Sequence, residues 1–239
     1  MMQIYRRLQP IKAISFDLDD TLYNNVPVIR HAEKKLLEFV NQQLSGAGYP
    51  SLDNAQWLAH KHAFSQRNLQ LAHDVSALRQ AFLLQFFTQH GIPKPKESAQ
   101  QAYQLFFQYR NNINVSESIV AQLIALKPHY PLIAITNGNA EPDLIGLSGI
   151  FDLVLRPRNH LRMKPAADLF VEASRLLTLK AQQILHVGDS EITDVAGAIR
   201  SGCQSVWFNP EQRHFSGPTL PDAQVSSIEQ LTLWLINQP

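Results

Sequence analysis

Apolar residues follow two different spacings along the chain. Short, nearly continuous apolar runs stand at about residues 11–16 and then again, after residue 116, in alternation with segments of helical periodicity. Such runs are typical of strands that a parallel sheet buries on both faces. The later predicted strands lie within residues 131–138, 151–157, 184–190 and 204–210, and the helical segments between them include 165–177 and 194–202.

Between the first run and the second, apolar residues recur at helical spacing instead. Four helices are predicted there, joined by short loops, at residues 27–44, 52–71, 75–90 and 97–109. The whole pattern predicts an α/β fold with a Rossmann-like parallel sheet. We expect a core of residues 1–23 and 114–239, interrupted after its first strand by a helical-bundle cap of residues 24–113.

Composition limits the possible classes of protein. Hydrophobic residues make up 45% and charged residues 17% of the 239 positions, which is typical of a globular chain. The net charge of +1 argues against general binding to nucleic acid or to acidic membranes. Cys203 is the single cysteine, and Asp17 and Asp19 interrupt the first apolar run too early for a signal peptide or a membrane span. These features predict a cytoplasmic protein, and no obligate protein partner is evident.

Polar side chains follow three of the predicted strands. Because ligands bind outside the carboxyl ends of parallel strands, we expect these side chains to meet at one edge of the sheet. Two carboxylates there would repel each other unless a cation lay between them, and hard oxygen ligands favour Mg²⁺. The sequence therefore predicts a magnesium site. The residues after the three strands are Asp17 and Asp19, Thr136 and Asn137, and Asp189 with Asp194.

Each of these pieces also has a simpler structural interpretation. An aspartate or threonine after a strand often caps the next helix, and Gly188 can serve only to allow a tight bend. Lys164, before Pro165, fits a solvated lysine in front of a proline-started helix. Independent caps have no reason to supply a nucleophile, a metal ligand and a cation together, so their joint occurrence favours a functional site.

Four segments carry a family resemblance as a set. DLDDT, ITNGN, MKP and GDSEITD resemble, in this order, the four motifs of the haloacid dehalogenase-like hydrolases. The predicted insertion resembles the helical cap of that superfamily's first subclass. The segment FDLDDTLY, the tripeptide His73-Asp74-Val75 and the segment TDVAGAIRSG also resemble its phosphatases of riboflavin metabolism, which act on flavin mononucleotide or 5-amino-6-(5-phospho-D-ribitylamino)uracil.

The resemblance implies a magnesium-dependent phosphatase. Asp17 would be the nucleophile that forms an aspartyl-phosphate, and Asp19 would protonate the leaving alcohol and then activate water. Asp17, the backbone carbonyl of Asp19, and Asp189 would hold Mg²⁺. An acid at the position of Asp19 is absent from the dehalogenase branch, so its presence favours phosphate chemistry.

The remaining motif residues would bind the phosphate or support the site. Thr136, the backbone amide of Asn137, and Lys164 would hold phosphate oxygens. Asp194 would accept a hydrogen bond from a metal-bound water or from Lys164 and so orient it, and a helix-capping role is the alternative.

The predicted cap offers fewer signals. His73 and Arg79 lie near a helix start and are candidates for substrate contact, although a solvent-facing Arg79 is an equal alternative. Its aromatic residues fit either stacking on a flavin or pyrimidine ring or, more simply, filling of the helical bundle.

Three other functions remain open at this point. A phosphosugar mutase has both core aspartates, and a broad-specificity sugar-phosphate or nucleotide phosphatase has all the core motifs. A non-catalytic module that binds a small phosphorylated metabolite fits less well, because such a module does not need both Asp17 and Asp19.

Overall fold

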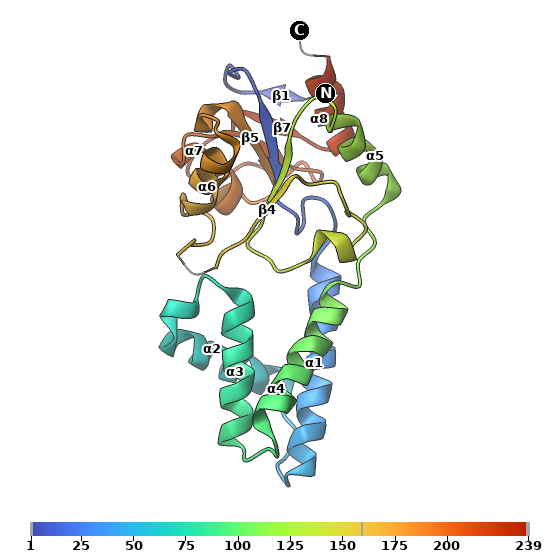
Figure 1. Cartoon of the computed structure of the whole chain (residues 1–239), viewed down its shortest axis with the longest axis vertical. Coiled ribbons are helices and arrows are strands. Elements are labelled where there is room, and N and C mark those ends of the chain that lie inside the picture. Colours follow the sequence, from blue (N-terminus) through green and yellow to red (C-terminus); the bar gives the residue numbers. More distant parts are fainter. Residues whose placement is uncertain (1, 159, 238–239) are drawn as a thin grey trace. The chain divides into compact units, whose positions relative to one another are not determined.

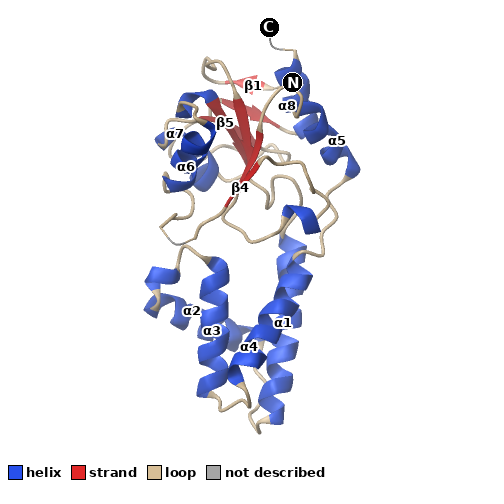
Figure 2. Cartoon of the chain, in the orientation of Figure 1, coloured by secondary structure: helices blue, strands red, loops and turns tan. Residues whose placement is uncertain are grey.

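The computed structural model describes residues 2–158 and 160–237. The chain divides into two compact units, one of residues Met1–Asn24 with Asn114–Pro239 and the other of residues Asn25–Ile113. We refer to them as the core unit and the helical unit. Residues 25–113, all of which the structure describes, form helices and loops, whereas every strand in Figure 2 belongs to the core unit.

A seven-stranded sheet forms the centre of the core unit, in the order β1-β7-β6-β5-β2-β3-β4. All neighbouring strands are parallel except β1 and β7. The predicted α/β fold class is therefore confirmed. The strands are β1 (Gln3–Ile4), β2 (Ala13–Phe16), β3 (Leu132–Ile135), β4 (Leu153–Leu155), β5 (Ile184–Gly188), β6 (Gln204–Phe208) and β7 (Ala223–Val225).

The first predicted strand, β2, lies between β3 and β5. Phe16 pairs with Ala134 on one side and with Val187 on the other, so the carboxyl ends of these three strands are level. Every residue of β2, β3 and β5 is buried, which explains their continuous apolar runs. Whatever follows these strands must lie at one edge of the sheet.

Helices cover both faces of the sheet (Figure 1). Helices α5 (Glu117–Leu126) and α8 (Ile228–Ile236) lie on one face, and α6 (Asp168–Leu177) and α7 (Gly197–Arg200) lie on the other. The helix predicted to start at Pro165 begins at Asp168 instead, where the Asp168 carboxylate accepts hydrogen bonds from Arg162. The segment predicted as a helix over 194–202 is a π-helical turn, Glu191–Ala196, followed by α7.

The helical unit contains α1 (Val26–Gly46), α2 (Asn54–Arg67), α3 (Val75–Gln89) and α4 (Pro95–Arg110). Asp53 begins α2 with a reciprocal capping box, and the carboxylate of Asp74 caps α3. The predicted helix 52–71 is interrupted after Arg67, because the Asn68 side chain donates to the Phe64 carbonyl and ends α2. Residues Leu69–Leu71 form a short 3₁₀ helix.

Aromatic rings fill the interior of the helical unit. Trp57 lies 5.0 Å from Phe82 and 5.4 Å from Phe86 between ring centroids, and Phe87 and Phe106 are fully buried in the same cluster. Of the two interpretations of these rings, bundle filling is the one that their packing supports.

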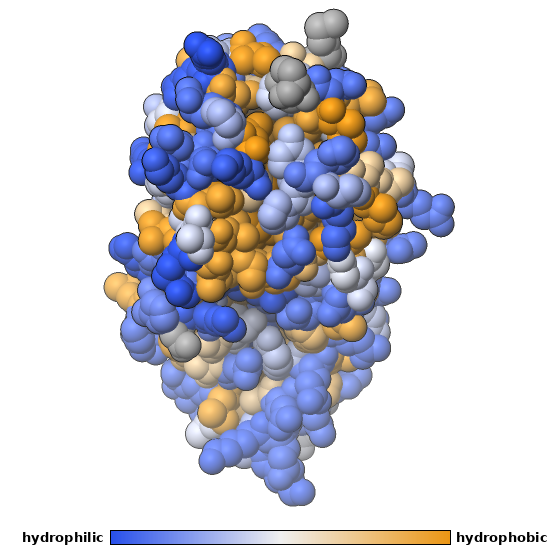
Figure 3. All heavy atoms as spheres, turned by 45° about the horizontal axis from the view of Figure 1, so that its top comes forward, coloured by the Kyte–Doolittle hydropathy of each residue, from blue (hydrophilic) through white to orange (hydrophobic). Residues whose placement is uncertain are grey.

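The face of the molecule drawn in Figure 3 mixes apolar and polar side chains. The exposed apolar residues of the core unit include Ile4, Ile124 and Leu233. Among the described residues, no helix combines the length and the apolar character needed to cross a membrane.

Candidate active site

Three carboxylates converge at the carboxyl edge of the sheet in the core unit. Asp17 follows β2, Asp189 follows β5, and Asp194 comes from the π-helical turn that begins at Glu191. One oxygen of each carboxylate lies within 4.8 Å of the other two, which is close enough for a shared metal ion. The predicted convergence of strand ends thus brings these three residues together.

Lys164 lies inside this cluster and is only 1% exposed. Its Nζ donates to Asp17 Oδ1 at 2.8 Å, to Asp194 Oδ1 at 2.6 Å and to the carbonyl of Ile135 at 2.5 Å. The alternative of a solvated lysine is therefore wrong. The Asn137 side chain holds the Lys164 backbone. Its Oδ1 accepts from the Lys164 N–H at 2.8 Å, and its Nδ2 donates to the Lys164 carbonyl at 2.9 Å.

The electrostatics of the cluster leave an excess of negative charge. Burial raises the pKa of Asp17, and burial together with Asp194 and Asp20 raises the pKa of Asp189 to about 6. Burial opposes ionisation of Asp194 as well, but Lys164 and His186 hold its pKa well below the usual range. The cluster holds three carboxylates and one lysine, which pairs with Asp17 and Asp194 but not with Asp189, so the donor set fits a divalent cation.

Asp194 makes close contacts on every side. Its Oδ2 accepts from the Ser190 backbone N–H at 3.0 Å, while its Oδ1 accepts from Lys164. A Cβ added at Gly188 would lie 2.3 Å from Asp194 Cγ, so only glycine permits this approach. Because both of its oxygens already have protein donors, Asp194 is better placed to orient Lys164 than to bind a metal directly.

His186, which sequence reasoning did not select, lies behind Asp194. Its Nε2 is 3.2 Å from Asp194 Oδ1 and its Nδ1 is 2.9 Å from Ser15 Oγ. Burial and the positive charge of Lys164 lower the His186 pKa to about 4, so the imidazole is neutral near pH 7. A carboxylate cannot donate, so Nε2 carries the proton and Nδ1 accepts from the Ser15 hydroxyl. A buried chain of hydrogen bonds thus runs from Ser15 to Asp17.

Three hydroxyl groups form hydrogen bonds at this edge of the sheet. The Asp189 backbone N–H donates to Thr21 Oγ1 at 3.1 Å, which ties the residue after β5 to the loop after β2. The Tyr23 hydroxyl donates to Asp19 Oδ1 and orients that carboxylate. Thr136 is buried, and its Oγ1 accepts from the Gly138 N–H at 3.0 Å. Thr21 and Tyr23 are a further pair that sequence reasoning did not single out as site residues.

Comparison with known proteins decides the family. The family model of the haloacid dehalogenase-like hydrolases matches residues 11–202. The chain belongs to this hydrolase family. It is 38% identical to the 5-amino-6-(5-phospho-D-ribitylamino)uracil phosphatase YigB of Escherichia coli (strain K12), over 97% of this chain and 99% of the relative. The predicted membership is therefore confirmed.

Two other proteins resemble this hydrolase, one in sequence and one in structure. The human N-acylneuraminate-9-phosphatase is 23% identical, over 94% of this chain and 93% of the relative. A solved structure of a 2-haloacid dehalogenase from Pseudomonas syringae pv. Tomato DC3000 superposes with a TM-score of 0.86 at 28% identity, covering 95% of this chain and 98% of that one. The family and the phosphatase relatives confirm the predicted class of enzyme, a phosphatase.

The two residues predicted to contact substrate from the cap both lie in the helical unit. His73 is exposed, just before the Asp74 cap of α3. Arg79 is not solvent-facing: it donates to Glu33 at 2.9 Å, lies 3.6 Å above the Phe106 ring, and its side chain is 15% exposed. Their contact with substrate stays a prediction.

Proposed function

We propose that this hydrolase is a Mg²⁺-dependent phosphatase of a small phosphorylated metabolite, namely a ribityl phosphate such as flavin mononucleotide or 5-amino-6-(5-phospho-D-ribitylamino)uracil. The observation that carries the reaction is the buried Asp17 carboxylate, 2.8 Å from Lys164 Nζ, with Asp19 two residues further on. The proposed substrate is based on the relative at 38% identity, which is named a 5-amino-6-(5-phospho-D-ribitylamino)uracil phosphatase.

In the first step, a carboxylate oxygen of Asp17 attacks phosphorus in line with the ester oxygen. The bond between phosphorus and that oxygen breaks, and the carboxylic acid of Asp19 gives its proton to the leaving alcohol. The hydrogen bond from Tyr23 fixes the rotamer of Asp19 for this transfer. The product is an aspartyl-phosphate on Asp17.

In the second step, a water molecule attacks the phosphorus of the aspartyl-phosphate. The Asp19 carboxylate takes the proton of that water, and the bond between phosphorus and the Asp17 oxygen breaks. Inorganic phosphate leaves, and both aspartates return to their starting protonation states. Two easier steps replace one difficult hydrolysis.

Asp17, Asp189 and the backbone carbonyl of Asp19 would hold the magnesium ion. When bound, Mg²⁺ supplies positive charge that offsets the carboxylates and the phosphoryl oxygens. Lys164 adds a fixed positive charge beside Asp17. Thr136 and the backbone amide of Asn137 would donate to phosphoryl oxygens. Asp194 keeps Lys164 in place.

One observation favours a second candidate function. The solved structure with a TM-score of 0.86 is titled a 2-haloacid dehalogenase. A carboxylate nucleophile such as Asp17 can also displace a halide from carbon. Hydrolysis of a carbon–halogen bond needs no acid to protonate the leaving halide, whereas an alkoxide leaving group does. The oriented Asp19 therefore supports the phosphatase.

A substrate panel tests the proposal. We expect phosphate release from the two ribityl phosphates with Mg²⁺, none after chelation with EDTA, and no halide release from 2-chloropropionate. A faster turnover of sugar phosphates or nucleotides would contradict the proposed substrate, and interconversion of phosphosugar isomers without phosphate release would indicate a mutase. Halide release without phosphate release would contradict the reaction itself.

The Asp17→Asn variant tests the nucleophile. We expect at least about a 10³-fold loss of kcat, because an amide cannot form the acyl phosphate. Acid-quenched labelling with a ³²P-substrate should trap the phosphoenzyme in the wild type and not in the variant. Undiminished turnover in a folded Asp17→Asn protein would contradict the mechanism.

A further inference from the structure

Strand β6 places a tryptophan beside the end of β5, where Asp189 follows. Trp207 pairs with Gly188 in the parallel register, so it lies next to the residue before Asp189. Trp207 is fully buried, and its Nε1 donates to the backbone carbonyl of Asp189 at 2.9 Å. A buried indole N–H needs an acceptor, and the acceptor here is the main chain of a candidate metal ligand.

The loop after β6 folds back onto the same carbonyl. The Asn209 side chain closes this loop, because its Oδ1 accepts from the Arg213 N–H at 2.9 Å and its Nδ2 donates to the Arg213 carbonyl at 3.0 Å. The Arg213 guanidinium donates to the Asp189 carbonyl at 3.3 Å. Two side-chain donors from outside β5 thus meet at one backbone oxygen, and one of them is charged.

Glu191, two residues after Asp189, holds this loop as well. Its Oε2 accepts from the Ser216 backbone N–H and from the Ser216 hydroxyl, each at 3.0 Å. The Phe215 ring stands edge-on to the indole of Trp207, with 5.0 Å between the ring centroids. The segment of residues 207–216 is therefore attached both at Asp189 and beyond it, which keeps the indole in place.

Hydrogen bonds to the Asp189 backbone are shorter than the one to its carboxylate. Among the described residues, the side-chain donor to the carboxylate is the Thr21 hydroxyl, at a long 3.4 Å. The Asp189 N–H, by contrast, donates to Thr21 at 3.1 Å, and the Asp189 carbonyl accepts from Trp207 at 2.9 Å. The direction of the carboxylate therefore depends mainly on how the backbone is held.

We propose that Trp207 is a positioning residue, which holds the Asp189 backbone so that its carboxylate stays near Asp17 and retains a divalent cation. The inference rests on the proposed function for the role of Asp189 as a metal ligand. Loss of a hydrogen bond that orients a ligand residue typically lowers metal affinity roughly 10–100-fold. Because Trp207 bonds to Asp189 and not to Asp17 or Asp19, its removal should weaken metal binding rather than the chemical step.

Metal binding by Trp207→Phe tests the inference, because this variant keeps an aromatic ring and loses the N–H donor. Mn²⁺, which prefers the same oxygen ligands as Mg²⁺, is titrated into metal-free full-length protein and followed by electron paramagnetic resonance. We expect an affinity about tenfold below that of the wild type. In phosphatase assays, the Mg²⁺ concentration for half-maximal turnover should rise by the same factor, while kcat at saturating Mg²⁺ stays near the wild-type value.

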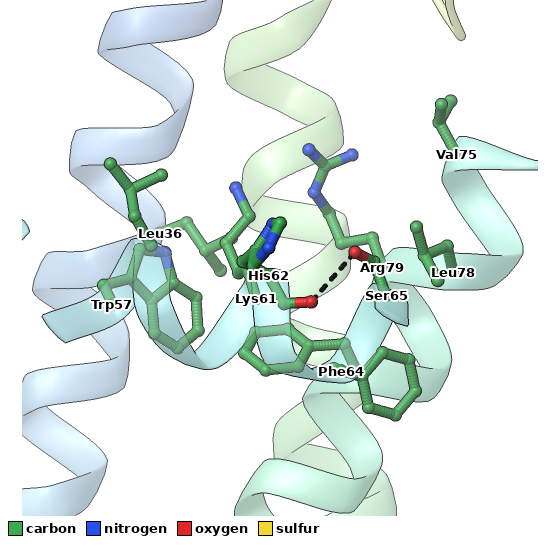
Figure 4. A pocket seen from close by; sticks show the side chains of 11 residues that line it. Leu36, Trp57, Lys61, His62, Phe64, Ser65, Val75, Leu78 and Arg79 are labelled. Carbon is green, nitrogen blue, oxygen red and sulfur yellow. Dashed lines mark hydrogen bonds between the residues drawn. The ribbon is translucent and has the colours of Figure 1, made fainter. Parts of the chain in front are cut away.

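Trp57→Phe is the matched control. Trp57 belongs to the helical unit, where it lines a cavity (Figure 4), and it is 1% exposed. Its Nε1 has no hydrogen-bond partner among the described residues, so the same substitution removes a buried N–H that holds no other group. We expect the Mn²⁺ affinity of Trp57→Phe to be unchanged. Thermal unfolding of both variants without metal checks that they remain folded.

The wild type allows a second measurement, which does not require Trp207→Phe to fold. The chain has three tryptophans, so a ¹H–¹⁵N spectrum contains three indole N–H signals. Trp57→Phe and Trp234→Phe assign two of them and leave the third to Trp207. The Trp207 signal should shift as Mg²⁺ saturates the site, because its acceptor belongs to a metal ligand, and the Trp57 signal should not. A Trp207 signal that does not respond to Mg²⁺ overturns the inference.

The outcomes separate this inference from the proposed function. A wild type that releases phosphate with Mg²⁺, together with a Trp207→Phe variant that binds Mn²⁺ as tightly, overturns the role of Trp207 and leaves the phosphatase proposal intact. Equal losses of affinity in Trp57→Phe and Trp207→Phe also overturn that role. A wild type that binds Mn²⁺, with the expected loss in Trp207→Phe but no hydrolysis of any phosphate ester, supports the positioning role and contradicts the proposed function.

Discussion

The two units each bury a small network of charges, and the two networks have opposite signs. In the core unit, Lys164 is shared by Asp17 and Asp194, and Asp189 lies beside them. In the helical unit, Glu33 is shared by two cations, Lys61 and Arg79. The excess of carboxylates in the first network favours a metal ion, whereas the excess of cations in the second does not. The sign of the unbalanced charge therefore distinguishes the two networks.

The networks also differ in their access to water. The side chains of Lys164 and Asp194 are 1% and 2% exposed, whereas those of Lys61 and Glu33 are 27% and 21% exposed. Removal of one partner from a dry network leaves a charge with no solvent to stabilise it, whereas water can partly replace a partner in the helical unit. Substitutions in the core network should therefore cost more stability.

Lys164→Met should give the largest effect on stability. It leaves two buried carboxylates without their cation, and we expect a loss of about 3–5 kcal/mol in the free energy of unfolding. Urea unfolding at pH 7.5 measures it. The control is Arg175→Met, which breaks a 2.7 Å pair with Glu172 in which the arginine side chain is 66% exposed, and which should leave the free energy of unfolding nearly unchanged. Equal losses in the two variants would contradict the role assigned to burial.

Gly188→Ala should come next. The added methyl group would overlap Asp194 Cγ at 2.3 Å, so the carboxylate must shift away from Lys164. We expect a loss of about 2–3 kcal/mol in urea unfolding, together with reduced turnover. In the helical unit, Gly46→Ala introduces a methyl group with no atom within 4 Å and should be neutral or slightly stabilising. Full activity in Gly188→Ala would refute the tight packing of Asp194.

Glu33→Gln should have a smaller effect that depends on pH. Burial opposes the Glu33 charge, but Lys61 and Arg79 outweigh it and lower the pKa below its ordinary 4.5. The ionised carboxylate therefore stabilises the folded state above pH 4.5, and this contribution is lost as the pH falls below it. We expect the free energy of unfolding of the wild type to exceed that of Glu33→Gln by about 1–2 kcal/mol at pH 7. In urea unfolding at a series of pH values, this difference should shrink below pH 4.5. A difference that is independent of pH would contradict this ion pairing.

Ser15→Ala should have the smallest effect of the four. It removes the donor to His186 Nδ1, and we expect a loss of about 1 kcal/mol and a modest decrease of kcat. Ser205 provides the control, because it pairs with His186 from the other neighbouring strand, is equally buried, and its hydroxyl has no partner among the described residues. Ser205→Ala should leave both quantities unchanged. Identical behaviour of the two variants would remove Ser15 from the hydrogen-bond chain.

The central strands and four helices of the insertion could be predicted because their apolar spacing extends over many residues. Strands β1 and β7, at one end of the sheet, could not, since β1 has two residues, β7 has three, and neither belongs to a longer apolar run. Gln3 of β1 pairs with Gln224 of β7, a partner that only the folded chain brings near. Helix α8 also escaped prediction, although Leu231 and Leu235 mark its buried face at helical spacing.

In the site, Asp17 and Asp189 could be predicted to converge because strand topology alone brings their positions together. The burial of Lys164 could not, because a lysine before a proline has the same local sequence whether it is buried or solvated. His186 lies within an apolar run, and its partner Ser15 comes from another strand. The ion pairs of Glu33 could not be predicted for a related reason, because its two cations lie on other helices, 28 and 46 residues away.

The insertion after β2 also affects the order in which the chain can fold. Ile14 of β2 must find Leu132 of β3 across the entire helical unit, and closing such a long loop slows folding. Within the helical unit, however, the ring of His31 near the start of α1 lies 5.1 Å from the ring of Tyr109 near the end of α4, measured between centroids. A helical unit that folds early therefore brings its own two ends together and shortens the loop that β2 and β3 have to close. We expect its local helices to form first and the parallel sheet to follow.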